Sequence, residues 1–335
     1  MSRGAVGLDI SDRSIKFVEL RRRWNGFGIG SFGEIAVPAG VIDDGEIQDE
    51  AELMRLLKNV GLGRHPVVAS LPDERGIIRR LELPDVSTED LPHAVRWEVE
   101  GLMPLPLYAV SYDYHSLPHF HTAAHQSAIV VAYPRAITES YHRVLAGAGL
   151  TPLVFEPESQ AVARAVAPAD TKQPVLIADI GAVRTSLIVT AGDSLFSAKS
   201  IPLGGRDIEA AIARELGVSL EKARAIKVDV GLDARWRGGL AAGSVYPLLE
   251  KLMGGINDML RSCRSVDIGT VYLCGGDANL IGIEKYLSSA TKMPVRLGDP
   301  FTNAGLEPGT VPPFPKSEAL RYAVAIGLAL RPALS

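Results

Sequence analysis

Short apolar runs alternate with glycine-rich breaks over residues 5–37. Runs of this length with a period of two are typical of β-strands, so the segment predicts a three-strand meander. The period then changes to that of a helix over residues 49–60, where the apolar positions are Leu53, Leu56, Leu57 and Val60. The apolar run at 66–72 that follows predicts a buried strand.

Residues 76–150 predict a block in the order strand, helix, strand, strand, helix. The run at 76–84 reads as a strand, and the next segment carries an apolar stripe at helical spacing, at Leu91, Val95, Val99 and Leu102. Residues 108–117 and 127–133 predict paired strands, and the amphipathic segment after them predicts a helix that ends at Gly149. We expect this block to fold as a small subdomain.

The rest of the chain alternates predicted helices and strands. A helix is expected from Phe155 to Val166, and Pro174 opens a strand–turn–strand unit that a third strand follows. The run at 270–276 predicts a strand entering a glycine turn, and 302–316 is a linker rich in Pro and Gly. Further helices are expected over residues 208–217, 219–227, 244–263, 279–291 and 319–331.

Two segments half a chain apart repeat the same pattern. Residues 175–190 align with residues 5–20 at an offset of 170 positions, which places Asp179 on Asp9, Ile180 on Ile10 and Gly181 on Ser11. Each segment is an apolar run that ends in Asp, followed by a short turn and a second apolar run. Alternating strands and helices with such a repeat predict an α/β fold that contains an internal duplication.

Composition narrows the class of protein. A length of 335 residues suggests about two domains, and 47% apolar with 22% charged residues is ordinary for a globular protein. The net charge of −4 gives no electrostatic reason to expect nucleic-acid or membrane-surface binding. Two cysteines, Cys263 and Cys274, fit buried thiols in a reducing compartment. We find neither a signal peptide nor an apolar run long enough for a membrane span, so we expect a cytoplasmic protein without direct membrane insertion.

The repeated turns suggest a chemistry. A turn between two strands presents backbone N–H groups that suit phosphate oxygens, and an Asp at the end of a strand holds a hydrated divalent cation. Two such turns facing each other would clamp the phosphates of a nucleotide from both sides. The Gly-Gly turn at 275–282 would let a purine lie against the backbone. Either turn alone is also what an ordinary β-hairpin needs.

These elements resemble the superfamily of actin, the large heat-shock chaperones and the sugar kinases. More narrowly, the chain resembles the PilM family of type IV pilus assembly proteins, which are relatives of the cell-division protein FtsA. The resemblance covers nearly the whole chain in order, through the motifs VGLDISDRSIKFVEL, GVIDDGEI, SLPDERGIIRRLELP, AVRWEVEGLMPLPL, VVAYPRAITESYHRVLAGAGLTP, DIGAVRTSLIV, IPLGG and LCGGDANLIGIEKYL.

The resemblance implies ATP and Mg²⁺ as cofactors. Asp9 and Asp179 would flank the magnesium through water, and Glu158 would lie near the catalytic water of what is at most a weak ATPase. The nucleotide-binding residues that it implies are Asp9, Ser11, Asp12, Arg13, Ser14, Lys16, Asp179, Gly181, Thr185, Gly204, Gly205, Arg224, Lys227, Gly275 and Gly276.

The resemblance also implies four subdomains of an actin-like fold around a nucleotide cleft. Subdomain 1A would comprise residues 1–75, 151–173 and 303–335. The inserted block 76–150 (1C) would take the place of the actin subdomain 1B. Subdomain 2A would comprise 174–206 and 268–302, and subdomain 2B would comprise 207–267.

The first turn departs from the family pattern. Ser11 stands where the family usually has Gly, charged Asp12 and Arg13 replace small residues, and Arg224 replaces a glutamate that would accept from the ribose. These changes keep a second hypothesis open: a degenerate scaffold of the same fold that no longer binds or hydrolyses ATP, like an adaptor of type II secretion. A small-molecule kinase of the superfamily is the third, although no polar cluster suggests a sugar pocket.

The resemblance implies a partner as well. Proteins of this family bind the cytoplasmic N-terminal peptide of the inner-membrane protein PilN between the first subdomain and the inserted one, which would hold this chain at the inner membrane. Trp97, Met103 and Pro104 are the candidate groove residues, although a Trp at this position would ordinarily be core. Self-association stays open.

The loop that contains His115, His119, His121 and His125 suggests two readings. Imidazoles suit zinc or nickel, but the segment from His115 to His125 contains no acidic or Cys side chain. Solvated histidines at a hairpin tip are the simpler reading.

Overall fold

The computed structural model describes residues 6–117, 125–169, 173–191 and 194–331. Two five-stranded sheets form its frame, and they have the same topology. The first has the order β10-β6-β1-β2-β3 and the second the order β15-β14-β11-β12-β13. The strands of the first are β1 (Val6–Ile10), β2 (Ser14–Arg23), β3 (Gly26–Ala36), β6 (Pro66–Leu71) and β10 (Thr151–Pro157). Those of the second are β11 (Val175–Ile180), β12 (Thr185–Ala191), β13 (Ser194–Ile201), β14 (Thr270–Cys274) and β15 (Val295–Leu297).

The duplication extends to the register of the strands. Asp9 pairs with Lys16 across β1 and β2, and Asp179 pairs with Ser186 across β11 and β12. In both halves the central strand is antiparallel to one neighbour and parallel to the other. The structure therefore confirms the repeat at the level of individual residues.

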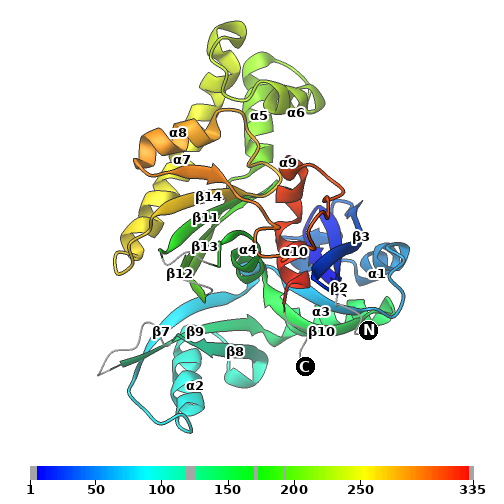
Figure 1. The fold of residues 1–335 in the computed structure, drawn as a ribbon, viewed down its shortest axis with the longest axis vertical. Coiled ribbons are helices and arrows are strands. Elements are labelled where there is room, and N and C mark those ends of the chain that lie inside the picture. The colour runs from blue at the N-terminus through cyan, green and yellow to red at the C-terminus, as the bar shows by residue number, and fades with distance from the viewer. Residues whose placement is uncertain (1–5, 118–124, 170–172, 192–193, 332–335) are drawn as a thin grey trace.

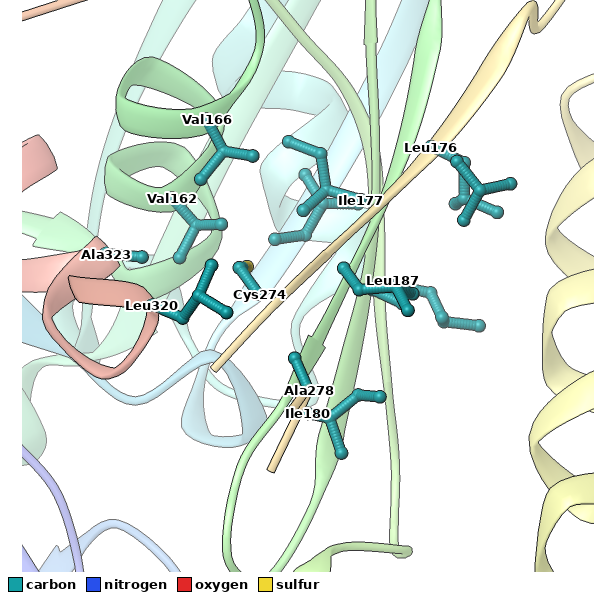
Figure 2. Close-up of a cluster of buried hydrophobic side chains, with 14 of the residues drawn as sticks. Val162, Val166, Leu176, Ile177, Ile180, Leu187, Cys274, Ala278, Leu320 and Ala323 are labelled. Atoms are coloured by element: carbon teal, nitrogen blue, oxygen red, sulfur yellow. The ribbon is translucent and has the colours of Figure 1, made fainter. Parts of the chain in front are cut away.

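Two helices lie between the sheets, α4 (Glu158–Val166) and α10 (Ala323–Ala329), as Figure 1 shows. Glycines allow their close approach, because a Cβ on Gly7 would lie 2.0 Å from the carbonyl oxygen of Ala325 and one on Gly327 would lie 1.8 Å from that of Ala161. Figure 2 shows the apolar contacts between these helices and the second sheet, made by Val162, Val166, Ile177, Cys274, Leu320 and Ala323.

Helices α1 (Glu50–Asn59) and α3 (Arg135–Gly147) cover the first sheet. The Asp49 side chain caps α1 by accepting from the Glu52 N–H, which confirms the helix expected over 49–60. Although α3 follows the inserted block in the sequence, its buried residues belong to the hydrophobic cluster of the first sheet; they are Ile137, Tyr141, Val144 and Leu145.

The inserted block has a sheet and a core of its own. Its strands are β7 (Ile77–Pro84), β8 (Val110–Ser116) and β9 (His125–Pro134), in the order β7-β9-β8, and α2 (Leu91–Leu102) packs on them. Figure 1 shows this sheet and α2 at the end of the molecule opposite α5 and α6. The apolar stripe predicted for α2 is buried here, at Leu91, Val95 and Val99.

Four further helices complete the second half, α5 (Gly205–Leu216), α6 (Leu220–Asp229), α7 (Leu240–Ser262) and α8 (Ile283–Thr291). The short elements are β4 (Ile42–Asp43), β5 (Glu46–Ile47) and α9 (Lys316–Ala319), together with the single-turn 3₁₀ helices η1 (Asp73–Arg75), η2 (Leu107–Ala109), η4 (Trp236–Gly239) and η5 (Leu320–Tyr322). In the part of the chain that the structure describes, no helix is long and apolar enough to cross a membrane.

One expectation about secondary structure was wrong, and one strand was missed. Phe155 does not begin a helix: it lies in β10, which pairs in parallel with β6 and ends at Pro157, where α4 begins. The strand β15, at the far edge of the second sheet, carries no clear alternation and was missed. Tertiary pairing, which a local pattern does not contain, determines both strands.

Candidate functional site

Carboxylates gather at one edge of the first sheet. Strands β1, β6 and β10 are parallel, so their carboxyl ends meet at the same edge. Asp9 lies at the end of β1, Asp73 follows β6 in η1, and Glu158 follows β10 at the start of α4. The aligned edge of the second sheet contributes Asp179 at the end of β11.

Asp9 is buried and pairs with Lys16, whose Nζ lies 3.4 Å from its Oδ2. Burial raises the pKa of Asp9, and the Lys16 charge opposes that rise. The neighbouring Ile10 N–H donates to the Ser70 hydroxyl at 3.1 Å, which ties the end of β1 to β6. The first aspartate is therefore fixed on both sides by the sheet that carries it.

Asp179 faces the same region from the second half. Burial raises the pKa of Asp179 to about 6, and the negative charge of Asp9 adds to the rise. The Lys16 ammonium acts in the opposite direction on the same carboxyl. Lys16 and Asp9 of the first half and Asp179 of the second half thus share one electrostatic environment.

Three more carboxyls face this environment. Burial raises the pKa of Asp73 to about 7, although Ser159 donates its backbone N–H to this carboxylate and lowers the pKa. Burial and then the charge of Asp9 hold the pKa of Glu158 well above its usual range, and burial raises the pKa of Glu74. Glu158 was predicted here, while Asp73 and Glu74 were missed. The signal that would have located them is their place directly after a strand parallel to β1.

The two turns close in the same way. The Ser11 N–H donates to the Ser14 carbonyl at 3.0 Å, and the Gly181 N–H donates to the Arg184 carbonyl at 2.9 Å. Gly181 was predicted for the second turn, and a Cβ there would lie 3.1 Å from that carbonyl. Backbone geometry is therefore conserved between the turns, while their side chains differ.

Protein groups already satisfy part of the second turn. The N–H groups of Gly205 and Arg206, at the start of α5, donate to the carbonyls of Gly181 and Ala182 at 2.9 Å each. A Cβ on Gly204 would lie 2.6 Å from the same turn. Gly204 and Gly205 therefore allow α5 to pack against the second turn, and the first N–H groups of α5 bond to that turn.

Thr185 also serves an internal contact. It is fully buried, and its hydroxyl donates to the Leu203 carbonyl at 2.7 Å. This bond joins the start of β12 to the segment after β13. In the first turn, Ser14 is buried as well, and its carbonyl accepts from the Ser11 hydroxyl at 3.0 Å.

Arg184, which the sequence analysis did not single out, reaches across to the first half. Its guanidinium lies 2.7 Å from Glu74 Oε1, 2.8 Å from Asp44 Oδ1 and 3.7 Å from Asp12 Oδ2. Asp12 also accepts from the Gly45 N–H at 2.9 Å. Arg184 therefore joins the second turn to the first turn and to two neighbouring loops.

The glycine turn after β14 abuts the same site. Gly275 has a φ of 88°, and a Cβ there would lie 2.4 Å from Asp179 Oδ1. A side chain at this position would displace the aspartate, so glycine is required. Gly276 is exposed, and a Cβ on it would meet only Arg321, at 3.8 Å. The turn leaves open space above Gly276.

Lys227 was expected to contact the nucleoside but is engaged within the protein. It is buried, and its Nζ pairs with Glu209 of α5 and with Asp277 of the glycine turn. Arg224, one helical turn earlier, is exposed on α6. Lys227 therefore joins α6 to α5 and to the glycine turn, and its contact with a nucleoside stays a prediction.

Polar atoms without partners test whether a metal–triphosphate would fit between the turns. Among the described residues, Arg13 Nε and Glu74 Oε2 are buried and have no hydrogen-bond partner. Arg13 lies in the first turn, where a phosphate oxygen would accept from it, and the nearby carboxyls call for a cation. The residues therefore fit the phosphate and metal part of a nucleotide.

The histidine loop is described only in part. His119 and His121 lie outside the described residues. Within the described ranges, no group of three or more His, Cys, Asp or Glu side chains could hold a metal ion directly. This is compatible with a metal that Asp9 and Asp179 hold through water.

The candidate groove residues separate into two kinds. Trp97 is 76% exposed on α2, so it is not core. Pro104 is exposed as well. Met103 is buried in the core of the inserted block, which corrects its assignment to an open groove. Tyr108, in η2 of the same inserted block, is 81% exposed.

Comparisons with known proteins agree with this architecture. The sequence model of the family described as "Type IV pilus assembly protein PilM" matches residues 7–333. The solved structure titled "PilM-PilN type IV pilus biogenesis complex" is similar with a TM-score of 0.81 and 26% identity, covering 98% of each chain.

Two more distant structures share the fold. The ethanolamine utilization protein EutJ from Carboxydothermus hydrogenoformans matches with a TM-score of 0.58 and 17% identity, over 98% of this chain and 90% of that one. MreB5 of Spiroplasma citri bound to ADP matches with a TM-score of 0.54 and 14% identity, over 97% and 95%. The fold is thus the duplicated actin-like fold that the sequence predicts.

Proposed function

Since this chain belongs to the PilM family of type IV pilus assembly proteins, we propose that it is an actin-like, ATP-binding assembly protein that docks the cytoplasmic N-terminal peptide of a PilN-like inner-membrane protein. The similar complex is named for PilM and PilN together, which supports this choice of partner. The proposal places the protein in the cytoplasm, held at the inner membrane through its partner.

The observation that carries nucleotide binding is the pair of turns in identical register. Each ends a buried central strand with an aspartate, and the two aspartates share one electrostatic environment. Asp9 and Asp179 would hold a magnesium ion through water, and Arg13 would donate to a phosphate oxygen. The bound nucleotide would supply a phosphoanhydride and a negative charge that varies with its phosphate number.

Glu158 is the candidate for a weak hydrolytic activity. Its raised pKa means that it holds a proton more readily than an exposed glutamate does. A cation near Asp9 and Asp179 would lower that pKa, and the ionised carboxylate would then accept a proton from a neighbouring water. Its position at the start of α4 is rigid, because Asp73 accepts from the N–H of the next residue, Ser159.

The exposed side chains of Trp97, Pro104 and Tyr108 on the inserted block are the proposed docking site for the peptide. Trp97 and Tyr108 offer aromatic side chains, the residue class that most often anchors an interface. Pro104 lies in the segment between them. Met103, the neighbour of Pro104, is buried in the core of the inserted block.

A scaffold that does not bind nucleotide remains the second candidate. The observations that favour it are internal partners where the family resemblance implies nucleotide contacts. Lys227 is paired with two carboxylates, Thr185 donates to Leu203, and the first N–H groups of α5 bond to the second turn. On this reading, peptide docking would not respond to ATP.

Calorimetric titration separates the two candidates. Mg-ATP is titrated into the full chain and into the Asp9→Ala and Asp179→Ala variants, and binding of a synthetic N-terminal peptide of the PilN-like partner is measured with and without nucleotide. We expect Mg²⁺-dependent ATP binding that both variants lose, and peptide affinity that changes with nucleotide. Peptide binding with no ATP heat would overturn the nucleotide proposal and support the scaffold.

A further inference from the structure

Arg184 occupies a position that the duplication makes informative. It is the last residue of the second turn and matches Ser14 of the first turn at the repeat offset. The side chain is only 20% exposed, although it is a guanidinium. A charge withdrawn from water in this way requires compensation by neighbouring groups.

All three of its ionic partners belong to the other half of the molecule. Asp12 lies in the first turn, Asp44 in the loop between β4 and β5, and Glu74 in η1. Asp44 is also held in place by Arg75, whose Nε donates to its carbonyl at 2.6 Å. A single side chain of the second half is thus bound to three carboxylates of the first half.

The halves are also joined by apolar contacts around α4 and α10 and by the hydrogen bond from the Gly275 N–H to the Leu320 carbonyl at 3.2 Å. The remaining ion pair between them, among the described residues, joins Lys316 to Asp299 at 3.1 Å, and the Lys316 side chain is 85% exposed. Exposed pairs contribute little because water screens them. Arg184 and its partners Asp12 and Glu74 are far less exposed, so their mutual attraction is stronger.

We propose that Arg184 is a latch that holds the two halves together through Asp12, Asp44 and Glu74, and that a polyphosphate bound between the turns releases it by taking the guanidinium. The release step rests on the nucleotide binding proposed above, whereas the latch itself does not. A guanidinium forms paired hydrogen bonds equally well with carboxylate and phosphate, so the two kinds of acceptor compete for Arg184.

The competition predicts that two variants both weaken the latch but change ATP affinity in opposite directions. Arg184→Gln removes the guanidinium, so the latch opens and the phosphate loses a donor. Asp44→Asn with Glu74→Gln removes two of the three negative charges that face the guanidinium, so the latch weakens while Arg184 becomes more available to phosphate. Asn is suited to position 44, where φ is 50°, because it tolerates the left-handed region.

The first measurement is the distance distribution between spin labels on the two halves. Labels on Lys58→Cys and Lys222→Cys, at exposed positions of α1 and α6, are read by pulsed electron resonance in the full chain without nucleotide. We expect a narrow distribution that broadens in both variants. Arg143→Gln, which removes an ion pair within the first half, 2.7 Å to Glu50, is the matched control and should stay narrow. An unchanged distribution in both variants would overturn the latch.

The second measurement is Mg-ATP affinity by calorimetry on the same proteins. We expect about tenfold weaker binding for Arg184→Gln and about tenfold tighter binding for the double variant, the size of one hydrogen bond to a charged group. Changes in the same direction, or none, would overturn release by phosphate. Broadened distributions with no ATP binding to any protein would support the latch and overturn the nucleotide function.

Discussion

The two halves of the molecule share a backbone and differ in charge. Strand order, register and the hydrogen bond that closes each turn are repeated. The first half carries Lys16 and an array of carboxylates at the edge where the turns meet. At the matched edge, the second half carries Asp179, Arg184 and glycines. The comparison teaches that the backbone is repeated while the charged side chains are not, so that each half contributes different groups to one charged site.

The halves differ in packing as well. Gly7 of β1 matches Ile177 of β11 at the repeat offset. Helix α10 lies so close to Gly7 that no side chain fits, whereas Ile177 is an ordinary buried side chain in the contact with α4. The residue type at these equivalent positions is therefore set by different constraints. In the first half it is the close approach of two backbones, and in the second half it is side-chain packing.

The largest expected effect is a loss of stability on substitution of Gly7, which should far exceed the loss at the equivalent position 177. Gly7→Ala should lower the free energy of unfolding by about 4–5 kcal/mol, since the added methyl group forces α10 away from β1. Ile177→Val, the matched conservative change in the second half, should cost about 1 kcal/mol. Urea denaturation followed by circular dichroism measures both. A Gly7→Ala protein as stable as the wild type would contradict the close approach.

The next effect depends on pH. Asp73, in the first half, has its pKa raised to about 7, and Asp179, in the second, to about 6, from an ordinary value of 3.8. A raised pKa means that the folded protein holds these protons more tightly than the unfolded chain does. Stability is therefore highest below 3.8 as far as these groups are concerned, and falls as pH rises to about 7.

Asp73→Asn should remove most of this fall and raise the free energy of unfolding at pH 8 by about 2 kcal/mol, and Asp179→Asn by about 1–2 kcal/mol. Thermal melts at a series of pH values without divalent ions provide the measurement. Added Mg²⁺ should stabilise the wild type at pH 8 and should stabilise Asp179→Asn less. A single variant whose stability falls as steeply as that of the wild type over the same pH range would rule out the substituted carboxyl as a cause.

The smallest effect concerns the position where the turns lead into their second strands. Thr185 donates to Leu203, whereas the matched Ile15 is apolar and fully buried. Thr185→Val should cost about 1 kcal/mol, because the Leu203 carbonyl loses its donor. Thr185→Ser keeps the hydroxyl and serves as the control. Equal stability of the valine variant and the wild type would show that the bond is not needed.

The sequence predicts the repeated strands of the two sheets better than it predicts the tertiary contacts. The repeat at Asp9 and Asp179 is visible because it depends on local alternation and a fixed offset, and the structure repeats it residue by residue. Strand β15 is not visible, since it is defined by its partner β14. Trp97 shows the limit of residue type, because its burial depends on where α2 packs.

The same limit applies to the candidate site. Asp9, Asp179 and Glu158 were predicted and lie in one environment, while their roles stay predictions. Arg184 was not predicted, since its partners Asp12, Asp44 and Glu74 are 110 or more positions away in the sequence. Lys227 was assigned to the nucleoside, yet Glu209 and Asp277 hold it. Long-range charge pairing is the information that the linear pattern lacks.

The convergence of both turns on one metal–nucleotide unit is tested most directly by a double-variant cycle. Mn²⁺ replaces Mg²⁺, and its binding in the presence of ATP is followed by electron paramagnetic resonance in Asp9→Asn, Asp179→Asn and the double variant. If the two aspartates share one ion, each single variant loses bound Mn²⁺. The double variant then loses no more Mn²⁺ than the single variant that binds it less well. Losses that add independently, or Mn²⁺ binding that survives both substitutions, would contradict the account.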